Sequence, residues 1–258
     1  MVGSVAIAID RRGAAGHVAT VTVDNPGRLN IVDPSAIAAL AAAMQQLGAD
    51  GKLRAVVLRG AGDKAFIGGA DIRAMAELDP ESARAFIAAL HRACDGIRRL
   101  PVPAIARLSG FALGAGLEIA ASCDLRIAAE GARFGMPEVR VGIPSVIEAA
   151  LLPQLIGWGR ARRLLYAGEI IGSAEAERWG LVERVVPGDA LDAAVEEWLD
   201  AILAAGPNAI RLQKALIRDW EELPLGAAIR RGIGAFAAAY ETDEPRERMA
   251  AFLNRRRD

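Results

Sequence analysis

The sequence predicts a mixed α/β fold, with a core over residues 1–189 that carries the chemically suggestive segments and a helical region over residues 190–258. The length of 258 residues fits one large α/β domain, or such a domain with a small appendage. Segments typical of strands alternate with segments typical of helices through the first part. Beyond about residue 190, helical segments follow one another, separated by short breaks that contain proline.

The first elements are a predicted β-hairpin and a helix. Residues 5–10 and 18–23 are rich in valine, isoleucine and alanine, and the glycine-containing segment between them is typical of a hairpin connection. Residues 36–47 form an alanine-rich run without internal glycine or proline, which predicts a helix. We expect Ser35 to cap this helix and Gly48 to end it.

Further along the chain, strands and helices alternate, which favours parallel crossover units. The expected strands cover residues 53–59, 104–108 and 124–129. The expected helices cover residues 80–99, a segment starting near Leu113 and a segment after Pro144. In the last part, we expect breaks between helices at residues 206–208, 223–224 and 243–245.

The composition excludes several classes of partner. Lys and Arg number 31 against 32 Asp and Glu, so no global positive field attracts nucleic acid or an anionic membrane. Hydrophobic residues make up 53% and aromatic residues only 5%, so the core must be built mainly from small and aliphatic side chains. The two cysteines, Cys94 and Cys123, and the absence of a leader-like start lead us to expect a cytoplasmic protein.

The first of three notable segments covers residues 60–72 and contains Gly68 and Gly69 just before an apparent helix start. Glycine lets the backbone approach a ligand closely, and the first amides of a helix have no partner within the helix. Such amides can hold an oxyanion. Taken alone, however, the segment is more typical of an ordinary turn between a strand and a helix.

In the second segment, residues 109–118, Ala115 and Glu118 are three positions apart at a predicted helix start. A free backbone amide and a carboxylate could therefore face the same side. A donor that stabilises negative charge beside a group that moves protons suits chemistry next to a carbonyl. The alternative is that Glu118 is a solvated acid of the first turn, which is favoured there by the helix dipole. The sequence leaves these two interpretations equal.

In the third segment, residues 134–144, Glu138 follows Pro137 within an apolar stretch. A carboxylate buried there without a cation would have a raised pKa. The alternative, which this segment alone favours, is a structural salt bridge from Glu138 to Arg133 or Arg140.

Other glycine-loop and histidine sites fit the sequence poorly. A dinucleotide fingerprint starting at Gly114 would need glycine where Ile119 stands, and the segment around Lys64 lacks the lysine and hydroxyl pair of a phosphate-binding loop. His17 and His91 show no ligand-like spacing. We interpret both histidines as structural or solvated.

Taken in order, four segments make the chain resemble the enoyl-CoA hydratase/isomerase (crotonase) superfamily. They are residues 64–72, 110–118, 134–138 and 180–187. The resemblance spans nearly the whole chain and implies a crotonase-like spiral of ββα units. It also implies a C-terminal helical region that forms a homotrimer, often within a homohexamer.

By this resemblance, the chain is an enzyme that adds water to a trans-2-enoyl-CoA and gives a 3-hydroxyacyl-CoA. The backbone amides of Ala70 and Ala115 would form the oxyanion hole, and Glu118 and Glu138 would be the acid/base pair. The family usually has glycine where Ala115 stands, and the added methyl group would narrow that position slightly. No metal and no separate cofactor are implied, because coenzyme A is part of the substrate.

The resemblance also implies a set of positions that bind the CoA thioester. They are Lys64, Ala65, Phe66, Gly69, Asp71, Ile72 and Gly114, together with Phe252 and Arg255 near the C-terminus. The last two match an aromatic and a basic position from which the C-terminal helix reaches CoA in related enzymes.

One departure from the family pattern follows Pro144. Many members continue with glycines and a threonine or serine, whereas this chain has Ser-Val-Ile-Glu-Ala-Ala over residues 145–150. We interpret Glu148 first as a helix-surface acid and second as a third polar group near the acyl site. Three alternatives to hydration remain: double-bond isomerisation, acyl-CoA hydrolysis, and a noncatalytic scaffold or RNA-binding role.

Overall fold

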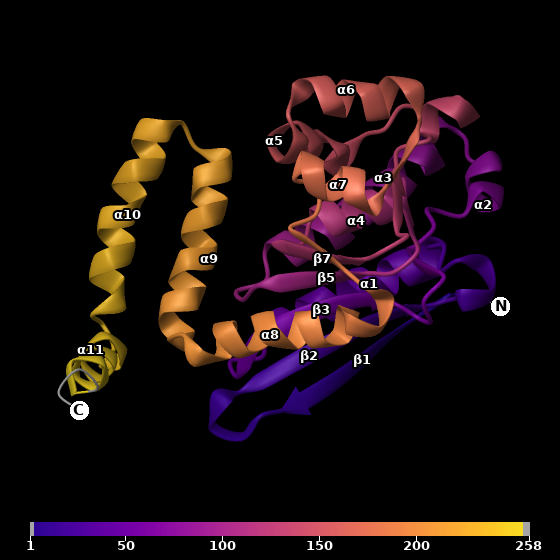
Figure 1. Ribbon diagram of the computed structural model, residues 1–258. Coiled ribbons are helices and arrows are strands. Elements are labelled where there is room, and N and C mark those ends of the chain that lie inside the picture. Colours follow the sequence, from indigo (N-terminus) through magenta and orange to yellow (C-terminus); the bar gives the residue numbers. More distant parts are fainter. Residues whose placement is uncertain (1–2, 255–258) are drawn as a thin grey trace.

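A six-stranded sheet forms the centre of the molecule in the computed structural model, which describes residues 3–254 (Figure 1). Its strands, in spatial order, are β1 (Ser4–Arg11), β2 (His17–Asp24), β3 (Leu53–Gly60), β5 (Ala104–Leu108), β7 (Leu125–Ala129) and β10 (Arg184–Val186). The first two strands are antiparallel, and the other pairs are parallel. The predicted hairpin and the three predicted later strands are therefore confirmed.

A second sheet of four short strands lies beside the first. It consists of β4 (Ala65–Ile67), β6 (Phe111–Leu113), β8 (Arg133–Gly135) and β9 (Ile170–Gly172), in that order. Three times in succession the chain leaves the large sheet and enters the small one: from β3 to β4, from β5 to β6 and from β7 to β8. This repeat is the spiral of ββα units that the resemblance implied.

Helices cover both faces of the large sheet, and β3 shows why. Val56 and Leu58 pack in one apolar cluster with side chains of α1 (Pro34–Gly48) and α3 (Pro80–Arg98). Their neighbours Ala55 and Val57 point to the other face and pack against α8 (Leu191–Ala204). Because successive side chains of a strand alternate between faces, the central residues 55–58 of β3 are apolar on both faces.

One local prediction is wrong. Asp33, not Ser35, caps α1, since its carboxylate accepts a hydrogen bond from the Ala36 amide while the Ser35 hydroxyl donates to Asp33. The helix predicted after Pro144 is confirmed as α5 (Leu152–Ile156), which follows a short 3₁₀ helix over Ile147–Leu151.

The remaining short elements connect the layers. The α-helices are α2 (Ile72–Ala76), α4 (Ala115–Ala121), α6 (Trp158–Ala167) and α7 (Ser173–Trp179). The other 3₁₀ turns are Gly13–Ala15, Pro26–Arg28, Glu138–Val141 and Gly188–Ala190. The helix expected near Leu113 is α4, which starts two residues later.

Helix α9 (Pro207–Glu222) contacts the core, since Arg211 donates to the Leu53 carbonyl of β3, whereas α10 (Leu225–Ala239) and α11 (Glu244–Asn254) extend away from the sheets (Figure 1). Helices α9 and α10 pack against each other. Large apolar side chains of α10 are nevertheless exposed: Leu225, Ile229, Ile233 and Phe236. Among the described residues, no helix is long and apolar enough to cross a membrane.

Candidate active site

The small sheet brings two of the notable segments side by side. Strands β4 and β6 are parallel, with Ile67 opposite Ala112 in their register. Ala70 and Ala115 each lie three residues beyond this pair, so both follow the carboxyl ends of adjacent strands. A side chain at Gly116 would collide with the carbonyl of Ile67, which shows how closely the two backbones approach. Glycine at this position therefore permits the site to assemble.

The amides of Ala70 and Ala115 donate no hydrogen bond to any residue within the described range 3–254. The amides next to them are hydrogen-bonded: the amide of Asp71 donates to the Val32 carbonyl at 3.0 Å, and the Gly114 amide donates to the Gly135 carbonyl at 2.9 Å. Ala115 is the first residue of α4, and the first amides of a helix have no acceptor within it. Two donors therefore remain available at the ends of β4 and β6.

Glu118 lies one turn into α4, and its side chain is only 4% exposed. Its Oε1 accepts a hydrogen bond of 3.3 Å from the Ala149 amide. Burial raises the pKa of Glu118 to about 8, and the negative charges of Glu138 and Glu148 contribute to this shift. The interpretation of Glu118 as a solvated first-turn acid is therefore wrong.

Glu138 begins a short 3₁₀ helix and lies beside the start of α4. A Cβ at Gly114 would clash with Glu138 Oε1, so the carboxylate lies against the backbone that carries the free amide of Ala115. The other oxygen of Glu138 accepts a hydrogen bond of 2.8 Å from the Ser145 hydroxyl. Within residues 3–254, no ion pair joins Glu138 to an arginine, and Arg140 donates to the Ala167 carbonyl instead. The salt-bridge alternative is therefore wrong.

Six of the positions expected to hold CoA lie in or near β4 and the start of α2. Ala65 and Phe66 belong to β4, and the Phe66 side chain is fully buried in the core, so only its backbone could meet a ligand. Asp71 caps α2 and accepts hydrogen bonds from Arg28, whereas Ile72 is exposed. Lys64 immediately precedes β4, and its carbonyl accepts from the Phe111 amide. Gly69 lies beside Leu113, because a Cβ there would be 3.4 Å from the Leu113 carbonyl oxygen.

Phe252 is not brought to this segment within one chain. Phe252 lies on α11, which is at the opposite side of the molecule from α2 in Figure 1. Arg255 lies outside the described residues.

Glu148 is the residue whose environment differs most from its first interpretation. Its side chain is 4% exposed, and its Oε1 lies at a hydrogen-bond distance of 2.8 Å from His91 Nδ1, so it is no helix-surface acid. Sequence reasoning missed the roles of His91, Ala149 and Ser145 in holding the acids. The departure from the family pattern over residues 145–150 was the signal for them, because Ser145 and Ala149 both lie in this segment.

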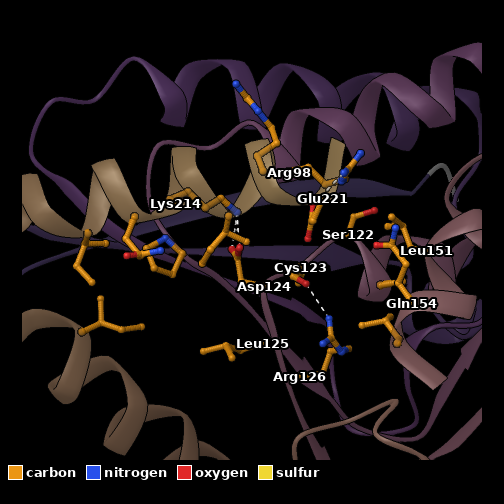
Figure 2. A pocket seen from close by; sticks show the side chains of 18 residues that line it. Arg98, Ser122, Cys123, Asp124, Leu125, Arg126, Leu151, Gln154, Lys214 and Glu221 are labelled. Carbon is orange, nitrogen blue, oxygen red and sulfur yellow. Dashed lines mark hydrogen bonds and ion pairs between the residues drawn. The ribbon is translucent and has the colours of Figure 1, made fainter. Parts of the chain in front are cut away.

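A cavity of about 320 Å³ lies elsewhere, between α9 and the C-terminal end of α4. Figure 2 shows Lys214 pointing at Asp124 there, and the two form an ion pair of 2.5 Å. Arg98 and Glu221, which also line this cavity, form a second ion pair of 3.0 Å. Within the described part of the chain, no group of three or more His, Cys, Asp or Glu side chains is arranged to hold a metal ion.

The spiral fold, with two carboxylates beside two free amides, defines the class of acyl-thioester enzymes that the sequence resembles. The family model for enoyl-CoA hydratase/isomerase matches residues 13–258, and the chain belongs to this family.

Individual relatives agree with this assignment. The chain is 35% identical to a short-chain-enoyl-CoA hydratase of Clostridium acetobutylicum, over 94% of this chain and 93% of the relative. It is also 35% identical to a crotonyl-CoA hydratase of Syntrophomonas wolfei, over 93% of each chain. A crystal structure of an enoyl-CoA hydratase from Bacillus anthracis superposes with a TM-score of 0.90 at 33% identity and covers 96% of each chain.

Proposed function

We propose that this enzyme adds water to a trans-2-enoyl-CoA and gives a 3-hydroxyacyl-CoA. The observation that carries the proposal is the placement of Glu118 and Glu138 around the start of α4, beside the free amides of Ala70 and Ala115. Relatives named as enoyl-CoA hydratases, at 35% identity over almost the full length, support the same reaction.

In this mechanism the two amides donate to the thioester carbonyl oxygen. They stabilise the negative charge that develops there when a nucleophile attacks C3. Glu118 removes a proton from the water whose oxygen bonds to C3, and Glu138 delivers a proton to C2. The thioester enolate is the species between these two steps, and no net proton is gained or lost.

The pair must hold one proton for this reaction. With a pKa of about 8, Glu118 carries that proton in the free enzyme at neutral pH. Hydration needs the other arrangement, in which Glu118 is ionised and Glu138 is protonated. The two arrangements contain the same number of protons, and the first one is competent for the reverse dehydration. The activity of the pair therefore depends on retaining one proton.

We further propose that residues 1–189 carry the site and that residues 190–258 support self-association as a homotrimer or homohexamer. The exposed apolar side chains of α10, Leu225, Ile229, Ile233 and Phe236, form a surface that association would cover. Because Phe252 lies away from α2 in its own chain, any contact with CoA would also require association. Light scattering coupled to size exclusion tests the assembly, and a monomer at micromolar concentration would contradict it.

A panel of CoA thioesters with product identification tests the reaction. Crotonyl-CoA and longer trans-2-enoyl-CoAs should yield 3-hydroxyacyl-CoAs, detected by mass. A product with a moved double bond from a 3-enoyl-CoA would indicate an isomerase, and free CoA detected by a thiol reagent would indicate a hydrolase. Binding of RNA with a steep salt dependence, without any thioester binding, would contradict an enzymatic role.

A further inference from the structure

Glu148 is a buried carboxylate that the proposed mechanism does not use. Its Oε1 is 2.8 Å from Nδ1 of His91, a half-exposed side chain on α3. Its Oε2 is buried and has no hydrogen-bond partner among residues 3–254. An ionised carboxylate only accepts hydrogen bonds. Among the described residues, the contact with His91 is therefore the one that fixes the orientation of the Glu148 side chain.

The residue after Glu148 touches the catalytic pair directly. The Ala149 amide donates to Glu118 Oε1 at 3.3 Å, and it is the hydrogen-bond donor that the structure gives to the Glu118 carboxylate. Glu148 and Ala149 belong to the same 3₁₀ turn, which packs against both α3 and α4. A contact that orients Glu148 therefore also sets the position of the Ala149 amide.

The turn itself has an unfavourable backbone. Ile147, its first residue, has a φ of +40°, a value that β-branched residues rarely adopt. Such a conformation persists only where the surrounding structure enforces it. The hydrogen bond between His91 and Glu148 ties this turn to α3 one residue after the strained position.

The titratable groups around Glu148 come from each neighbouring element. His91 and Cys94 face it from α3, and Glu118 faces it from α4. Glu138 adds a further negative charge near Glu118. His91 is thus the cationic partner among these groups when it is protonated.

We propose that Glu148, held by His91, is a positioning residue that fixes the turn over Ile147–Leu151 so that the Ala149 amide orients Glu118 for proton transfer. The expected change in kcat rests on the proposed hydration. The hydrogen bond between Ala149 and Glu118 does not, because it is a property of the free protein.

Two substitutions at Glu148 separate geometry from charge. Glu148→Gln keeps an oxygen that accepts from His91, so kcat should stay close to that of the parent. Because a negative charge near Glu118 is lost, the upper limb of the pH profile should move to lower pH. Glu148→Ala and His91→Ala remove the contact, and each should lower kcat by about 10-fold or more at an unchanged KM, because a displaced catalytic group loses its geometry.

Arg92→Ala is the matched control, since Arg92 is the exposed neighbour of His91 on the same helix. It should leave kcat, KM and the pH profile unchanged. His91→Gln can still donate to Glu148 and should recover most of the activity that His91→Ala loses. Melting temperatures of all variants check that each one is folded, and His91→Gln keeps the test possible if Glu148→Ala does not fold.

Amide hydrogen exchange over residues 147–151 supplies a readout that does not need turnover. We expect faster exchange at Ala149 in His91→Ala and Glu148→Ala, with no change in Glu148→Gln or Arg92→Ala. If both alanine variants are folded and retain the parental kcat and the parental exchange, the proposal is wrong. If the parent protein fails to hydrate any enoyl-CoA, the proposed function fails, and the exchange experiment still decides the positioning role.

Discussion

The two ends of helix α4 hold acids in opposite environments. At its amino end, Glu118 is buried with Glu138 and Glu148 nearby, and burial raises its pKa to about 8. Just beyond its carboxyl end, Asp124 accepts from the Lys214 ammonium at 2.5 and 2.6 Å and from the Ala104 amide at 2.7 Å. Figure 2 shows this second arrangement. One short helix thus separates an acid without a cation from an acid with one.

This difference distinguishes a chemical role from a structural one. A carboxylate paired with a cation and an amide is stabilised as an anion and fixes the elements that carry its partners. A buried carboxylate without a cation is costly as an anion, and it retains its proton to a pH at which it can exchange that proton with a substrate. We therefore assign the reaction to the amino end of α4 and a holding role to the carboxyl end.

Removing the acids at the amino end should have the largest effect. Glu118→Gln and Glu138→Gln each remove a proton-transfer group while keeping its size, and each should lower kcat for hydration by about 10² to 10⁴-fold. Steady-state rates with crotonyl-CoA and longer enoyl-CoAs measure this loss. Asp124→Asn at the other end is the control and should retain kcat. Variants of the pair that hydrate as fast as the parent would refute their roles, and tolerance of Glu118→Gln alone would favour an isomerase.

Filling the space beside Glu138 should have the next largest effect. A methyl group in Gly114→Ala would meet Glu138 Oε1, so the carboxylate must move, and we expect a loss of about 10²-fold in kcat. Gly131→Ala is a matched control, because Gly131 also has positive φ but has open space around its Cβ position. Both variants place a side chain on a residue with positive φ, so equal rates would show that the contact with Glu138 has no catalytic importance.

Breaking the pair at the carboxyl end should affect stability instead. Lys214→Met leaves Asp124 without its cation, and we expect a loss of about 2 kcal/mol in the free energy of unfolding. This loss is smaller than for a fully buried pair, because the Asp124 side chain is 22% exposed. Urea unfolding measures the change. Arg246→Met, which removes an exposed partner of Asp243, should cost less than about 1 kcal/mol. A large fall in kcat with unchanged stability in Lys214→Met would reverse the assignment of the two ends.

The pH dependence should show the smallest effect. The pair needs one proton, and the last proton leaves Glu118 with a pKa of about 8. The value of kcat/KM should therefore be halved near that pH and fall about tenfold per unit above it. Initial rates between neutral and alkaline pH, with unfolding monitored in parallel, give the profile. Rates that keep rising above this range in a folded protein would argue against a required proton.

The elements of the fold and the site differ in how well the sequence predicts them. Strands β1, β2, β3, β5 and β7 of the large sheet were predictable, because each is an apolar run of at least five residues between turns. Strands β4, β6, β8 and β9 have three residues each and are too short to show one. Glu118 and Glu138 were recognisable from their motifs, but the burial of Glu118 depends on a turn 30 residues away in sequence.

The contact between His91 and Glu148 was harder still to predict. It joins residues 57 positions apart. It also depends on a left-handed conformation at Ile147, which the preference of isoleucine argues against. Asp33 shows the same limitation on a small scale, since two neighbouring residues could both cap α1 and only the backbone path selects one.

Direct titration of Glu118 tests the central claim, which is that an acid without a cation at the amino end of α4 provides the reactive group. Carboxyl resonances of ¹³C-labelled glutamate, assigned by their loss in Glu118→Gln, follow its protonation in the free protein. We predict a midpoint near the value of about 8 that burial and Glu138 produce. A midpoint close to the ordinary value of 4.5 would show that Glu118 is stabilised as an anion, and it would contradict the account.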